Sequence, residues 1–144
     1  MTTWLRLLEH VHGHLAWLAT LALIHPAVLL RHPRRRAHLV TATATLLATA
    51  TAALGIALYP AYRSELKLRI FESSRALGDA FERKEHLAVA VVVLSWVGLV
   101  THWADAGTPA RAWGRVAHVA YAGAAALAVL TAGLGIAVAV ERSF

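Results

Sequence analysis

Four long, mainly apolar stretches constrain the fold more than any other feature of this sequence. They cover about 11–30, 37–60, 86–104 and 113–140, and 58% of the 144 residues are hydrophobic while only 15% are charged. A helix needs about 20 apolar residues to cross a bilayer, because every backbone polar group in hydrocarbon must be paired within its own segment. The pattern predicts an all-α membrane protein, a single domain built as a bundle of four transmembrane helices.

The charged residues gather between these stretches. Two short connections, 31–36 and 105–111, contain arginine and proline, which suits tight turns at the membrane surface. The net charge of +6 is therefore expected to face phospholipid headgroups, and no nucleic-acid partner is expected. The first stretch is too long for a signal peptide and lacks a cleavage site, so we expect it to be retained as a span.

The middle connection, 63–85, has a different pattern. Leu66, Ile70, Leu77 and Phe81 fall on one helical face, and the charged residues lie mostly elsewhere. This predicts an amphipathic segment that lies along the membrane interface. A solvated, charged loop is the alternative, because the apolar stripe is incomplete.

The two halves of the chain repeat each other. When His38 is aligned with His118, HLVTATATLLATATAALGIA lies over HVAYAGAAALAVLTAGLGIA without a gap, and 11 of the 20 positions are identical. The triplet HLA that begins at His14 likewise matches the one that begins at His86. Each half is therefore predicted to be a helical hairpin, and the two hairpins to be related by a pseudo-twofold axis along the membrane normal.

The repeat arranges four histidines in couples at two depths. His14 and His86 start helices on the N-terminal side of the membrane, whereas His38 and His118 start helices on the other side. Histidine inside a span is costly, so a functional role is the default interpretation. Two facing imidazoles can fill both axial positions of a b-type haem. The sequence thus predicts two haems b per chain, ~20 Å apart along the axis at 1.5 Å per residue, with these four histidines as iron ligands.

Two glycines fit this arrangement. Gly55 and Gly135 lie 17 residues beyond the first histidine of their helices, or ~25 Å at helical rise, and so return to the depth of the other couple. A glycine there would let the backbone approach a macrocycle closely. Ordinary helix–helix contact explains a small residue equally well.

The other histidines have alternative roles. His25 shares a helical face with His14 and is a candidate substitute ligand, a hydrogen-bond donor beside the haem, or part of a quinone site. His10 and His14 are four residues apart, a spacing that could instead chelate zinc or copper. His12, His32 and His102 lie near the span boundaries and are expected to face solvent or headgroups. The chain has no cysteine, which excludes disulfides, iron–sulfur clusters and covalently attached haem.

With these spans and these four histidines, the chain resembles the small four-helix di-haem cytochromes b that act as membrane anchors or electron conduits in respiratory chains. The resemblance implies an electron carrier and not a catalyst, in the inner membrane of a bacterium. The partners it implies are a quinone and a redox protein, and a homodimer is a further candidate. Some of those cytochromes take both ligands of each haem from one helix pair, whereas this chain would use all four helices.

Two other functions stay open. The same histidines could serve a proton or transition-metal transporter as relay groups or ligands. They could also make only interhelical hydrogen bonds in a structural membrane subunit.

Overall fold

The computed structural model describes residues 3–32, 37–105 and 112–141, and the regular structure among them is helical. The five helices are α1 (Thr3–Leu29), α2 (His38–Glu65), α3 (Lys67–Ser73), α4 (Arg75–Asp105) and α5 (Ala112–Glu141). All but α3 are long and apolar enough to cross a membrane. The predicted all-α bundle with four membrane-spanning helices is confirmed.

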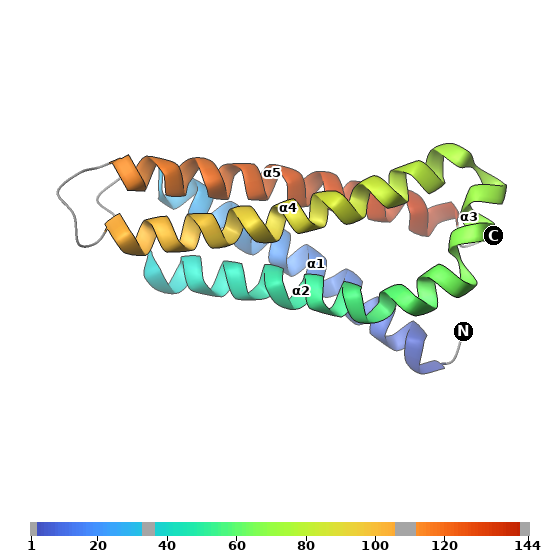
Figure 1. The fold of residues 1–144 in the computed structure, drawn as a ribbon. Helices are drawn as coiled ribbons and strands as arrows, with labels where there is room; N and C mark the ends of the chain where they lie inside the picture. The colour runs from blue at the N-terminus through green and yellow to red at the C-terminus, as the bar shows by residue number, and fades with distance from the viewer. Residues whose placement is uncertain (1–2, 33–36, 106–111, 142–144) are drawn as a thin grey trace.

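The four long helices run lengthwise along one bundle (Figure 1), and the pairs that pack together arrange them in a ring. Both α2 and α5 pack against α1 and against α4, and the most extensive packing joins α4 to α5. This order places α1 opposite α4 and α2 opposite α5. Equivalent helices of the two repeated halves are therefore diagonal neighbours, as a twofold relation requires. The start of α1 and the end of α5 lie at the same end of the bundle as α3, which we call the α3 end.

The centre of the bundle is closed by a polar network around Tyr121. This side chain is fully buried, as are Thr41, Thr45 and Ser95. The Tyr121 hydroxyl donates to the Thr41 carbonyl oxygen at 3.0 Å and lies 2.8 Å from Thr45 Oγ1, which lies 3.1 Å from the Ser95 carbonyl oxygen. The network joins α5, α2 and α4. It satisfies polar groups that could find no water in the bilayer.

A second, smaller core lies around α3. Ile70, Phe81 and Val138 are buried there, and Leu66 and Leu77 pack against them. The four residues expected to share one face thus meet in one cluster. The segment 63–85 is divided, however, between the end of α2, α3 and the start of α4, because Ser74 between α3 and α4 is extended.

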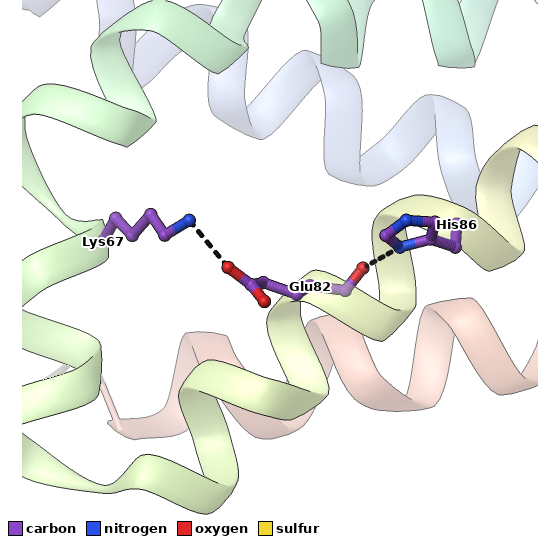
Figure 2. A network of polar contacts seen from close by, with 3 residues as sticks. All are labelled: Lys67, Glu82 and His86. Atoms are coloured by element: carbon purple, nitrogen blue, oxygen red, sulfur yellow. Dashed lines mark hydrogen bonds and ion pairs between the residues drawn. The ribbon is translucent and has the colours of Figure 1, made fainter.

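An exposed ion pair also joins α3 to α4 (Figure 2). Lys67 Nζ lies 2.6 Å from Glu82 Oε1, and the Glu82 carbonyl oxygen lies 2.9 Å from His86 Nδ1. The hydrogen bond to Glu82 raises the pKa of Lys67. Both side chains of the pair are more than a third exposed, and solvent screens such pairs strongly.

We therefore expect Lys67→Gln to leave thermal unfolding in detergent unchanged within experimental error. The control is Gly78→Val, also in the α3 region, which should unfold at a clearly lower temperature because a Cβ at Gly78 would overlap the Phe71 ring. A large loss of stability in Lys67→Gln would mean that the ion pair holds α3 in place.

Candidate functional site

The first predicted couple, His14 and His86, is not brought together. Both side chains are exposed on the outside of the bundle, on helices that lie opposite each other in the ring. His86 Nδ1 is instead hydrogen-bonded to the carbonyl oxygen of Glu82 in its own helix. In this structure neither imidazole points toward the interior between the two hairpins.

Gly55 and Gly135 lie near the expected depth, but they face other side chains. A Cβ built on Gly55 would lie 3.1 Å from His12 Cε1, and one built on Gly135 would lie 3.9 Å from Lys84 Nζ. His12 and Lys84 each stand two residues before the predicted ligand of their helix. They are therefore equivalent in the repeat, and the two hairpins make the same contact, in which a nitrogen-bearing side chain covers a glycine.

His12, expected to face solvent or headgroups, is half-buried. Its Nδ1 is buried without a hydrogen-bond partner in the described part of the chain, although the imidazole also interacts with the backbone of Thr51. Two residues rotate by about 200° on a helix, so His14 must point outward where His12 points inward. The positions of Gly55 and Gly135 in the sequence could have pointed to His12. They indicate the depth in the bundle at which a ligand would lie, but they do not single out His14 at that depth.

At the opposite end, His38 pairs with His102. The two ring centroids are 4.8 Å apart with the planes tilted by 40°, and the Trp103 ring lies edge-on to His38 at 5.9 Å. His102 is only 7% exposed, so the expectation that it faces solvent or headgroups is wrong. The Ala37 N–H donates to His102 Nε2 at 3.3 Å. Because α2 has no side-chain cap of its own, an imidazole from α4 satisfies one of its orphan N–H groups.

His118 remains apart from His38. It is half-buried, and its Nδ1 is buried without a hydrogen-bond partner among the residues that the structure describes. One turn further along α5, Tyr121 crosses the interior to Thr41 and Thr45. The Tyr121 ring therefore fills the interior one turn away from His118.

The remaining histidines face outward. His25 is exposed, and His10 is exposed with its Nδ1 hydrogen-bonded to the Arg6 carbonyl oxygen at 2.7 Å. Over residues 3–32, 37–105 and 112–141, no three histidine, aspartate or glutamate side chains are grouped to hold a metal ion. A zinc or copper chelate at His10 and His14 would thus lack further ligands in that part of the chain.

The buried histidine nitrogens suit haem better than a bare metal ion. A zinc or copper site needs three or four protein ligands, whereas haem iron arrives with four porphyrin nitrogens and needs only axial ligands. Each end of the bundle offers one half-buried imidazole of this kind, His12 and His118. Each end thus offers one candidate axial ligand, and not the facing couple that the sequence predicts.

No family model, curated protein or solved structure was found to match this chain. The likeness to di-haem cytochromes b rests on the spans and the histidines alone.

Proposed function

We propose that the protein is a b-type haem protein that carries electrons across the membrane, with His12 and His118 as the buried axial ligands. The observation that carries the proposal is one partnerless, buried imidazole nitrogen at each end of the bundle. Leaving such a group unpaired costs about 1–3 kcal/mol. A buried polar atom without a partner needs a physical explanation, and a redox role is one of those found in native proteins.

The two ends are separated by about the thickness of the hydrocarbon. Gly55, which faces His12, and His38 at the opposite end are 17 residues apart on α2, which is ~25 Å along a helix. The hydrocarbon core of a bilayer is about 30 Å thick. Two redox centres at these ends would therefore lie toward opposite membrane faces, as a transmembrane carrier requires.

Positively charged side chains near His12 and His118 can bind the carboxylates of the haem. Arg115 is exposed three residues before His118, and Lys84 approaches His12 closely enough to influence it electrostatically. Cations at these places would bind the haem carboxylates. When bound, haem supplies one-electron chemistry at iron, and the chain positions it and keeps water from its inner edge.

We also propose the partners and the location of this electron carrier. Haem iron exchanges single electrons, so we propose a quinone and a redox protein as its partners. We place the protein in the inner membrane of a bacterium. The apolar surface of the four candidate spans supports contact with a bilayer.

The test is the haem content of purified variants by the pyridine haemochrome assay. We expect about two haems per chain in the wild type and about one in His12→Ala and in His118→Ala. The matched controls His14→Ala and His86→Ala remove exposed imidazoles and should keep the full content. Loss in the controls and not in His12→Ala would restore the couples expected from the sequence. A wild type without haem would contradict the proposal and favour a structural subunit.

A further inference from the structure

The outer face of α1 carries an unbroken seam with heptad spacing. Its residues follow one another at alternating steps of four and three, the spacing of the a and d positions of a left-handed coiled coil. All of them are exposed, and we call them the α1 seam: Leu7, Val11, His14, Leu18, Leu21, His25 and Val28. Such spacing allows two helices to pack along their whole length.

The two histidines distinguish this seam from a lipid-facing surface. Leucine and valine are as stable against lipid as against protein, but the imidazole nitrogens of His14 and His25 find no hydrogen-bond partner in hydrocarbon. Ionisable side chains within membrane spans almost always face protein or a water-filled cavity. The outward face of α4 exposes one histidine, His86 at the start of the apolar stretch, and its Nδ1 is already hydrogen-bonded to the Glu82 carbonyl oxygen. Further along α4 the exposed residues include Val89, Val93 and Trp103. The α1 seam therefore needs a protein cover that the other faces do not.

The seam is complementary to itself. Two copies inserted in the same direction can place their α1 helices side by side and parallel about a twofold axis along the membrane normal. Each seam residue then meets its own counterpart at the same depth. A neutral imidazole has one donor and one acceptor nitrogen, so two identical histidines can form a hydrogen bond.

We propose that the α1 seam is the interface with a second copy of this chain, in which His14 pairs with the partner's His14 and His25 with the partner's His25. In a single copy, neither His14 nor His25 has the second imidazole with which it would form this hydrogen bond. Polar residues at a or d positions fix register and oligomeric state, and these two pairs fix the parallel arrangement. The α1 seam contains neither of the proposed haem ligands, His12 and His118, so this interface does not depend on haem.

The absence of cysteine makes cross-linking the direct test. In liposomes at low protein density, Leu21→Cys at the middle of the seam should form a disulfide-linked dimer on mild oxidation. The matched control Val93→Cys, at a similarly exposed position on α4, should stay monomeric. Equal cross-linking of both variants, or none through Leu21→Cys, would overturn the proposal. So would purification of the wild type as a monomer bound to a different protein through α1.

The histidine pairs are tested by the dimer dissociation constant, measured by energy transfer between labelled copies in liposomes. His14→Ala with His25→Ala should weaken dimerisation roughly 5- to 10-fold, since such bonds are modest in membranes. His14→Gln with His25→Gln should restore most of the affinity, because an amide also pairs with itself. Circular dichroism verifies that the variants are folded. An unchanged dissociation constant in the alanine variant would remove the histidines from the interface.

Discussion

Replacing Tyr121 with alanine is expected to lower the free energy of unfolding by about 3–5 kcal/mol. The side chain is fully buried at the centre of the bundle and reaches from α5 to Thr41 and Thr45 of α2. Its loss leaves a cavity and also removes the hydrogen bonds that join diagonal helices. The measurement is equilibrium unfolding in mixed detergent micelles, followed by circular dichroism.

The control Tyr121→Phe separates the two contributions. It keeps the ring and removes only the hydroxyl, so a loss of about 1–2 kcal/mol is expected. If the alanine variant were no less stable than the phenylalanine variant, the ring would not be part of the core. That result would reopen the space between His38 and His118.

Gly98→Val should lower the free energy of unfolding by about 3 kcal/mol, because the added side chain overpacks the core around Tyr121. A Cβ at Gly98 would lie 2.7 Å from the Tyr121 ring, so either the ring or the helix must shift. The matched control is Gly133→Val on α5, where nothing lies within 4 Å of a built Cβ. This variant should change the free energy of unfolding by no more than about 0.5 kcal/mol.

The double variant tests whether Gly98 and Tyr121 act on one another. Gly98→Val combined with Tyr121→Ala should cost clearly less than the sum of the single changes, because alanine makes room for the valine. Additive losses would show that the two positions are not in contact.

The fold was predictable because length and apolarity alone decide whether a helix can cross a bilayer. The four spans follow from uninterrupted apolar runs, and the repeat anticipates the diagonal placement of equivalent helices. Where the helices begin was harder to predict. α4 starts at Arg75, well before the apolar stretch, because its charged first turns pack on α3 and hold Phe81 in the small core.

The site was only partly predictable, because a membrane helix is apolar on all sides and its pattern does not show which face points inward. His12 and His14 differ by two residues, and their sequence surroundings are alike. Only the packing of the helices decides that His12 covers Gly55 while His14 points out. The burial of His102 was hidden for a similar reason, since its partner is the backbone N–H of Ala37, which has no sequence signature.

Whether the protein carries haem is tested most directly by the absorption spectrum of the purified wild type, recorded before and after addition of dithionite. We predict a red protein with a Soret band that shifts on reduction, as haem iron held by histidine requires. A colourless protein that also fails to take up added haemin would contradict it.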